Sequence, residues 1–143
     1  MNKNYYITTP IYYVNDKPHI GHAYTSIACD VLARFKRLEG YNVKFLTGTD
    51  EHGQKVEKAA KLKNKSPLEY ANFISKDFKS LTKTLNLSND DFIRTTEKRH
   101  ILAAQSLWSK LYKNKHIYLD KYAGWYALRD EAFYSEKEII NGK

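Results

Sequence analysis

Two histidines flank a short apolar step in the tetrad His19-Ile20-Gly21-His22, which lies between an apolar segment and an amphipathic one. At the start of a helix, free backbone N–H groups and the helix dipole favour an anion. Side chains three residues apart in a first helical turn share a face, so His19 and His22 can aim two imidazole donors at one point. Because Gly21 has no Cβ, a phosphate or an adenine ring can approach its backbone closely. This arrangement suits the α-phosphate of ATP as it becomes five-coordinate.

Two other interpretations of these histidines stay open on spacing alone. They can form a metal pair, for which Asp50 or His52 would supply a third ligand. They can also be surface or helix-capping residues that bind nothing.

A second polar cluster occupies residues 48–53, Gly-Thr-Asp-Glu-His-Gly, where an apolar run ends. Asp50 can hold an ammonium group there, and His52 with Gly53 can reach a nucleotide. We expect Glu51 to face solvent or to cap the following helix. The alternative is a solvated turn followed by a helix N-cap, without a ligand.

An aromatic segment, "TTPIYYVND", covers residues 8–16. Pro10 and the tandem Tyr12-Tyr13 would form an apolar wall beside the end of a strand. Such a wall suits a hydrophobic side chain on a substrate. The alternative is that these tyrosines are core residues.

The composition suits one compact domain, or one domain and the start of another, because the chain has 143 residues. The net charge of +8 favours phosphate-rich partners such as nucleotides or RNA. The lysines are spread along the chain, however, so a general lysine-rich composition explains the charge equally well.

Cys29 is the only cysteine, which excludes intramolecular disulfides and cysteine-cluster zinc sites. A single cysteine agrees with a reducing compartment, and we expect a cytoplasmic protein. The sequence contains no run of about 18 apolar residues, so we expect no membrane partner.

The hydrophobic pattern predicts strands that alternate with helices. The expected strands cover residues 5–14, with an interruption near Pro10, residues 41–50 and residues 90–96; the expected helices cover residues 23–39, residues 66–87 and a segment that Thr96 caps. Ser66, Pro67 and Glu69 form a capping box with proline at the first helical position. The alternation predicts an α/β fold with a doubly wound parallel sheet, in which ligands bind beyond the carboxyl ends of the strands.

Each predicted helix has an apolar stripe that we expect to be buried. The stripe of the first helix comprises Ala23, Ile27, Ala28, Val31, Leu32, Phe35 and Leu38; that of the second comprises Leu68, Ala71, Ile74, Phe78, Leu81 and Leu85; that of the third includes Ile101, Ala104 or Gln105, Trp108 and Leu111. After residue 115 the sequence predicts small strands and one helical turn.

The motifs together resemble a known family. "TTPIYYVNDKPHIGHAYT" followed by "FLTGTDEHGQKV", with "DDFIRTTEKRH" and "GWYALRDEAFYSEKEI", closely resembles the start of the bacterial methionyl-tRNA synthetases, which are class I aminoacyl-tRNA synthetases. The tetrad alone is shared with other class I synthetases and loosely with nucleotidylyltransferases. The tyrosine segment and residues 48–53 favour the methionyl family over both.

The resemblance implies an enzyme that activates methionine with ATP, accompanied by Mg²⁺, to methionyl-adenylate and then transfers methionine to tRNA-Met. It implies that His19 and His22 contact ATP and stabilise the transferring phosphate, and that adenine packs on Gly21. It also implies that Asp50 holds the methionine ammonium group. Ile11 and Tyr13 match residues that line the methionine pocket, and Pro10 flanks them.

The sequence departs from the family pattern at two places. Ala127 and Asp130 stand where many relatives have zinc-binding cysteines, so we expect no zinc. No Lys-Met-Ser-Lys-Ser loop occurs in the chain. We therefore expect an N-terminal piece of a longer enzyme, inactive by itself. Residues 1–115 would form the first half of the Rossmann-like catalytic domain, and residues 116–143 the beginning of its small connective insertion. The alternative is a truncated paralogue that binds a nucleotide or RNA without catalysis.

Overall fold

The computed structural model describes residues 3–140. The chain forms two compact units, Met1–Leu102 and Ala103–Lys143. These units are defined by contacts within the chain and do not test the predicted boundary between catalytic domain and insertion at residues 115 and 116. That boundary stays a prediction. Within residues 3–140, no helix combines the length and the apolar character that crossing a membrane would require.

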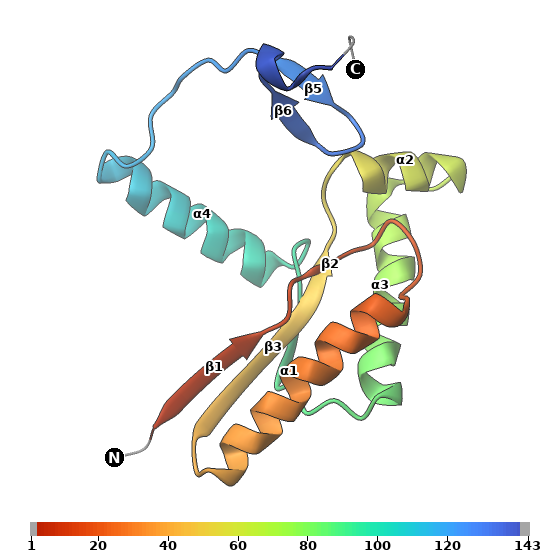
Figure 1. Cartoon of the computed structure of the whole chain (residues 1–143), viewed down its shortest axis with the longest axis vertical. Helices are drawn as coiled ribbons and strands as arrows, with labels where there is room; N and C mark the ends of the chain where they lie inside the picture. The colour runs from red at the N-terminus through yellow and green to blue at the C-terminus, as the bar shows by residue number, and fades with distance from the viewer. Residues whose placement is uncertain (1–2, 141–143) are drawn as a thin grey trace. The chain divides into compact units, whose positions relative to one another are not determined.

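A parallel sheet forms the centre of the first unit, as the sequence predicts. Its long strand is β3, Asn42–Asp50. The strands β1, Asn4–Thr8, and β2, Tyr12–Tyr13, follow one another along one edge of β3, and β4, Asp91–Arg94, pairs with the other edge. Figure 1 shows β1 in red beside the yellow β3. The predicted interruption near Pro10 is confirmed, because the chain leaves β3 between β1 and β2.

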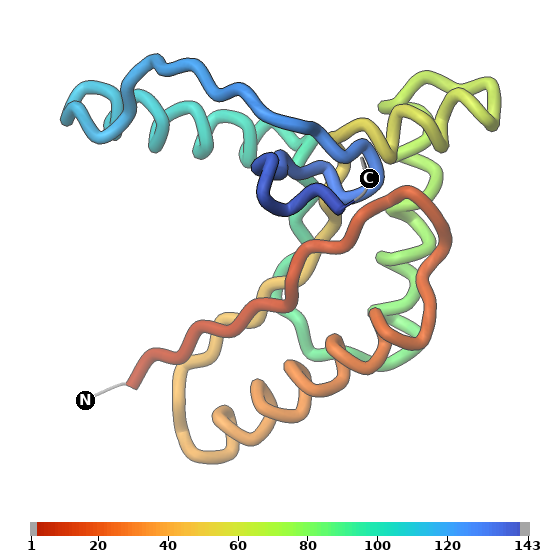
Figure 2. Tube along the Cα trace, turned by 45° about the horizontal axis from the view of Figure 1, so that its top comes forward, coloured from red at the N-terminus to blue at the C-terminus, as the bar shows by residue number. Residues whose placement is uncertain are grey.

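Helices connect these parallel strands. Helix α1, Ile20–Leu38, packs on β3 and β1; helix α3, Pro67–Thr84, packs on β3; and helix α2, Gln54–Leu62, packs on α3. The path from β1 through α1 back to β3, and then through α3 to β4, is continuous in Figure 2. Because α1 and α3 each return the chain to a strand parallel to the sheet, the arrangement is the predicted α/β fold.

The helix boundaries differ from prediction at two places. Helix α1 begins at Ile20, so the histidine tetrad forms its first turn instead of preceding it. No range was predicted for helix α2, although a helix N-cap was one interpretation of residues 48–53; only Val56 and Ala60 are buried in it, and two residues give a weak periodic signal. The capping box of α3 is confirmed: the Ser66 side chain accepts from the Glu69 N–H, and the Glu69 carboxylate accepts from the Ser66 N–H.

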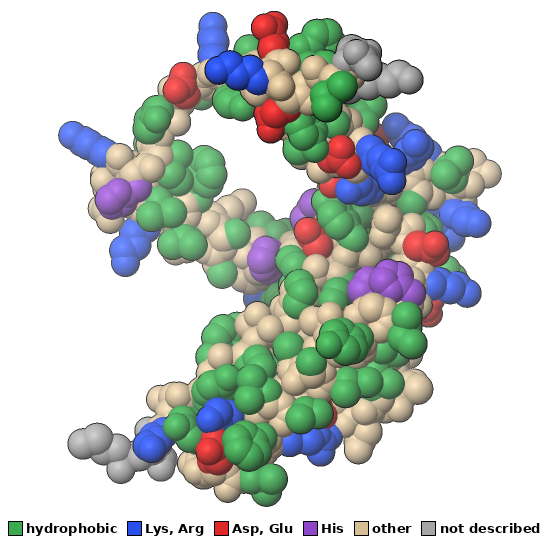
Figure 3. All heavy atoms as spheres, in the orientation of Figure 1, with side chains coloured by type: hydrophobic (Ala, Val, Ile, Leu, Met, Phe, Trp, Pro, Cys, Tyr) green, Lys and Arg blue, Asp and Glu red, His purple; other side chains and the backbone are tan. Residues whose placement is uncertain are grey.

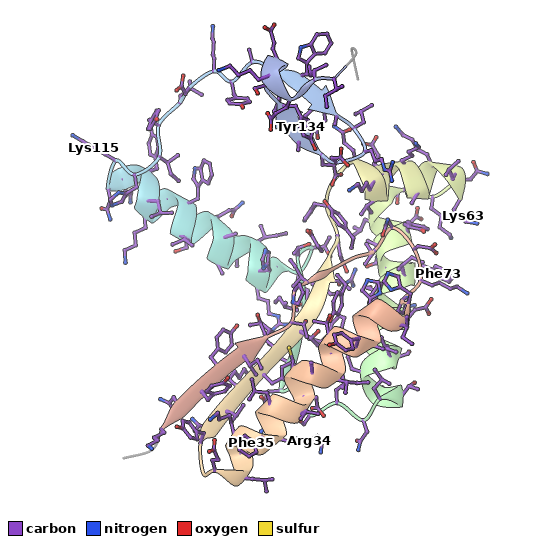
Figure 4. The ribbon with its side chains drawn as sticks, viewed as in Figure 1. Arg34, Phe35, Lys63, Phe73, Lys115 and Tyr134 are labelled. Carbon is purple, nitrogen blue, oxygen red and sulfur yellow. The ribbon has the colours of Figure 1, made fainter. Side chains whose placement is uncertain are left out.

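The buried face of α1 is not its apolar stripe, and that prediction is wrong. Ser26, Asp30 and Ala33 are buried instead, whereas the side chains of Val31 and Phe35 are 61% and 53% exposed. Figure 3 shows hydrophobic side chains gathered on the surface in this region, and Figure 4 labels Arg34 and Phe35 near the end of the helix. The buried face of α1 makes polar contacts, because Asp30 accepts hydrogen bonds from the Ser88 N–H and hydroxyl, both at 2.6 Å.

The fourth helix also keeps its apolar side chains exposed. Helix α4, Lys98–Lys113, contains no buried residue, so the predicted burial of Ile101 and Trp108 is wrong. Thr96 does not serve as a simple cap, because its hydroxyl donates to the Glu51 carboxylate.

Two clusters of buried side chains hold the first unit together. One lies between α1 and the sheet and comprises Ala33, Val43 and Phe45. The other joins the β2 segment to α2 and α3, and comprises Tyr12, Val14, Val56, Ala60, Tyr70, Ala71, Ile74 and Phe78. The second cluster fixes the segment that precedes the histidine tetrad, so it positions the candidate site.

The second unit contains a short antiparallel hairpin. Strands β5, Trp125–Ala127, and β6, Ala132–Tyr134, pair with Trp125 opposite Tyr134, and the 3₁₀ turn η1, Glu136–Glu138, follows. These elements confirm the small strands and single helical turn predicted after residue 115.

We expect Gly48→Ala to destabilise the chain by about 3 kcal/mol or more, at the upper end of overpacking effects. A Cβ at Gly48 would lie 2.0 Å from the backbone oxygen of Ile93, its partner in the β3–β4 ladder. Guanidinium unfolding would measure the loss as a lower midpoint. Gly40→Ala is the control: Gly40 has φ +81° with open space around it, so only about 1–2 kcal/mol of backbone strain applies. Equal losses in both variants would contradict the expectation.

Candidate functional site

The two histidines of the tetrad cap α1 with their own imidazoles. His19 is the N-cap residue, and its Nδ1 accepts from the Gly21 N–H at 3.1 Å. The Nδ1 of His22 accepts from the His19 N–H at 3.0 Å. The rings stack with centroids 3.8 Å apart. The capping part of that interpretation is therefore confirmed, and binding of a ligand by the same imidazoles stays a prediction.

These hydrogen bonds assign the tautomer of each imidazole. An Nδ1 that accepts from a backbone N–H carries no proton, so the neutral ring carries its proton on Nε2. Burial, and then the neighbouring His19, hold the pKa of His22 below its ordinary value. The lowered pKa keeps the His22 ring neutral near pH 7. In this hydrogen-bonding arrangement each of the two rings presents one Nε2–H donor. Two such donors can bind phosphate oxygens, whereas the Nδ1 atoms are already engaged.

Gly21 leaves room for the His19 ring. A Cβ at Gly21 would lie 3.0 Å from Cε1 and 3.1 Å from Nδ1 of that ring. Such contacts are tighter than ordinary side-chain packing, so alanine would push the capping imidazole aside. The predicted approach of a nucleotide to Gly21 is a separate role and stays a prediction.

Tyr12 is a core residue, so the aromatic wall is smaller than the sequence suggested. Its side chain is only 8% exposed, and its hydroxyl forms a hydrogen bond with Ser26 Oγ at 3.0 Å. Its ring lies 4.8 Å from that of His22, and Phe78 lies 5.0 Å from the same imidazole. Tyr12 and Phe78 therefore support His22 from the side of the core.

Strand β2 connects the two polar clusters through adjacent residues. Tyr12 contacts His22, and Tyr13 is the register partner of Asp50 at the carboxyl end of β3. The Val14 N–H donates to the Asp50 backbone oxygen at 3.4 Å. The structure thus ties the start of α1 and the end of β3 to the same two-residue strand. Asp50 and Tyr13 are half-buried, and Pro10 and Ile11 are exposed, so a ligand can reach them.

His52 and Gly53 lie where β3 turns into α2. Together with Glu51, they border a cavity of about 360 Å³, whose other lining residues are Gln54, Val56, Glu57 and Pro67. His52 is exposed, and its Nε2 lies 3.4 Å from the Thr95 backbone oxygen. Gly53 is the N-cap residue of α2 with φ +111°, a conformation that favours glycine. The predicted nucleotide contacts of both residues stay predictions.

Glu51 contradicts its prediction. Instead of facing solvent, its side chain is fully buried and forms an ion pair with Arg94 of β4. The pair joins residues 43 positions apart, so no local pattern reveals it. The available sequence signal for its burial was a carboxylate directly after an apolar strand.

The described residues offer little support for the metal-pair interpretation. Between residues 3 and 140 the structure assembles no group of three or more His, Cys, Asp or Glu side chains that could hold a metal ion. Asp130, which stands at one of the family's cysteine positions, accepts a hydrogen bond from the Tyr134 hydroxyl at 3.3 Å.

Comparisons with known proteins show which family the chain resembles. A family profile described as "tRNA synthetases class I (M)" matches residues 5–143. The whole chain is 62% identical to a methionine–tRNA ligase of Rickettsia bellii and covers 28% of the length of that ligase. Over 98% of its length, the chain is 53% identical to the methionine–tRNA ligase of Bacillus subtilis and covers 21% of the length of that ligase. The chain thus spans about a quarter of the length of these curated relatives.

A solved structure extends the similarity to three dimensions. The fold matches Mycobacterium tuberculosis methionyl-tRNA synthetase in complex with methionyl-adenylate, with a TM-score of 0.91 and 48% identity. The match covers 98% of this chain and 28% of that chain.

We expect the stability of the chain to fall as the pH drops from about 7.5 to 5.5, partly through His22. The folded chain lowers the pKa of His22, so it binds this proton less readily than the unfolded chain does. The contribution is therefore complete above the unfolded value of about 6.5 and is lost as the pH falls through the folded pKa. Thermal unfolding at a series of pH values would measure it.

The control separates titration from capping. His22→Gln keeps a side chain that can cap the His19 N–H but cannot titrate, so its pH dependence should be weaker. His116→Gln replaces an exposed histidine and should retain the dependence of the original chain. A His22→Gln variant with an unchanged pH profile would contradict the assigned protonation.

Proposed function

The chain belongs to the class I tRNA synthetase family that the (M) profile describes, and from this premise we propose that it forms part of a methionine–tRNA ligase. The proposal rests chiefly on the pair of neutral, stacked imidazoles at the start of α1. The relatives matched at high identity are ligases, so the non-catalytic nucleotide- or RNA-binding alternative is not favoured.

In the proposed reaction, the methionine carboxylate attacks the α-phosphorus of ATP. A new phosphorus–oxygen bond forms, the bond to the β-phosphate oxygen breaks, and pyrophosphate leaves with that electron pair. The Nε2–H groups of His19 and His22 donate to the phosphate oxygens, which gain charge in the five-coordinate transition state. Neutral donors suit this role because the step requires no proton transfer from the protein.

The proposed methionine site lies beside β2. Asp50 holds the α-ammonium group, and Ile11 and Tyr13 line the side-chain pocket with Pro10 at its flank. The register pairing of Tyr13 with Asp50 supports this assignment, because it makes an aromatic residue the neighbour of a half-buried acidic residue across the two strands. A thioether is soft and unbranched, so an apolar and aromatic lining selects it by shape.

The remaining contacts concern ATP and the acceptor. We assign Gly21, His22, His52 and Gly53 to nucleotide binding. Mg²⁺ would neutralise phosphate charge, held mainly by the nucleotide itself, which agrees with the lack of an acidic cluster in residues 3–140. tRNA-Met is the proposed acceptor, and the cytoplasm is the proposed location.

We expect the 143-residue chain by itself to show almost no methionine-dependent exchange of pyrophosphate into ATP. Its sequence carries the histidine tetrad but no Lys-Met-Ser-Lys-Ser loop, and incomplete orientation of the substrates removes much of the rate. Robust exchange by the chain would contradict the expectation.

A chimaera tests the function directly. We expect the chain to support exchange when it replaces the matching 140 residues of the Bacillus subtilis ligase. His22→Ala in this chimaera should lower kcat by about 10²–10³ while changing the KM for ATP less, because the donor acts mainly in the transition state. His116→Ala is the matched control at an exposed histidine.

Direct binding covers the case in which the chimaera does not fold. Titration of the 143-residue chain with a non-hydrolysable methionyl-adenylate analogue should perturb the NMR signals of His22 and Asp50. An inert chimaera together with no perturbation of the NMR signals would overturn the proposed function. Equal losses in kcat and in ATP affinity for His22→Ala would overturn the proposed role of His22.

A further inference from the structure

The buried carboxylate of Glu51 has partners on every side. Arg94 donates to it through two nitrogens, Nε to Oε1 at 2.7 Å and an Nη to Oε2 at 2.8 Å. The Thr49 hydroxyl donates to Oε1 at 2.8 Å, and the Thr96 hydroxyl donates to Oε2. The carboxylate is therefore fully satisfied although water does not reach it.

This network joins three elements. Glu51 directly follows β3, and Arg94 is the last residue of β4. The guanidinium of Arg94 also donates to Asn72 Oδ1 of α3 at 2.6 Å. Hydrogen bonding to Glu51 raises the pKa of Arg94, which keeps the guanidinium charged. The carboxyl ends of two neighbouring strands and one covering helix are thus held by a single ion pair.

The backbone on either side of Glu51 is fixed as well. Its N–H donates to the Thr95 hydroxyl at 2.9 Å, and the Thr95 N–H donates to the Thr49 oxygen at 3.3 Å. The Thr95 oxygen lies 3.4 Å from Nε2 of His52. Asp50 and His52 are the immediate neighbours of Glu51, so the position of the ion pair determines where both side chains begin.

Stability by itself explains such a pair poorly. Removing two charges from water costs several kcal/mol per ion, and apolar residues of similar volume are often as stabilising. Fold stability also has other sources at this place, since the β3–β4 ladder runs over four residue pairs. What the ion pair adds is a fixed geometry, because a bidentate arginine fork permits one orientation of its carboxylate.

We propose that Glu51 and Arg94 form a positioning pair, which holds Asp50 for the ammonium group of methionine and His52 for the nucleotide. The identity of the two ligands rests on the proposed function. The claim that the ion pair orients Asp50 and His52 does not depend on it. Neither residue touches substrate; each acts through the neighbours that it orients.

The test uses Glu51→Gln, which keeps the shape and breaks the charge pair, and Arg94→Lys, which keeps the charge and loses the fork. Asp91→Asn is the matched control, because Asp91 pairs with Arg99 at the opposite end of β4, with both side chains partly exposed. The first readout needs no ligand: NMR signals of Asp50, His52 and Gly53 should shift in both test variants and stay unchanged in the control.

The second readout is calorimetric titration of the 143-residue chain with the methionyl-adenylate analogue and with ATP. Both test variants should lose about tenfold or more in affinity for the analogue, because small misplacements of positioned groups are costly. Affinity for ATP should fall less, since the imidazoles of His19 and His22 lie outside the network. Arg94→Lys, the milder change, keeps the test open if Glu51→Gln does not fold.

Three outcomes decide the matter. Shifts confined to residues 50–53 with selective loss of analogue binding support the proposal. Unchanged signals, or equal losses for both ligands that follow the fall in Tm, overturn it and leave a purely structural role. If the original chain binds no analogue and the chimaera is inert, the proposed function fails, and the ligand-free signals still decide whether the pair positions Asp50 and His52.

Discussion

The hydrogen bonds from the backbone of the first α1 turn to two imidazole nitrogens are the constraint on which the candidate site depends. They satisfy N–H groups that a helix start leaves unpaired. Because each Nδ1 accepts a hydrogen bond, the same bonds favour the tautomer that carries its proton on Nε2. These two hydrogen bonds thus cap the helix and determine which ring nitrogens remain for a ligand. The proposed binding of phosphate by the imidazoles would use the same geometry as the cap.

Core side chains pack against this first turn of α1. Tyr12 and Phe78 hold His22 laterally, and Tyr13 extends the same strand to Asp50. Because β2 is only two residues long, its two side chains serve different purposes: one is buried under the helix and the other is available beside the carboxylate. On the opposite edge of β3, the ion pair between Glu51 and Arg94 fixes the next residue. The site is therefore held from both edges of one strand.

The sequence predicted those features that depend on nearby residues. The start of α3 follows from Ser66, Pro67 and Glu69, and the parallel sheet follows from alternating apolar segments. Features that depend on distant partners were missed. Buried Asp30 accepts a hydrogen bond from Ser88, 58 positions away, so no local pattern indicates that this face of α1 is the buried one. At the candidate site, the residue types of the histidine pair and Asp50 were readable, whereas the tautomers and the burial of Glu51 required the fold.

The outer edge of β1 has a consequence for how this protein behaves at high concentration. Within residues 3–140, β1 pairs with β3 on one edge and with no strand on the other. Such an edge offers a row of amide and carbonyl groups to any extended peptide, and the exposed ring of Tyr6 on the same strand adds apolar surface. We expect this edge to favour association between copies in concentrated solution. Repulsion from the net charge of +8 opposes such association, and added salt weakens that repulsion.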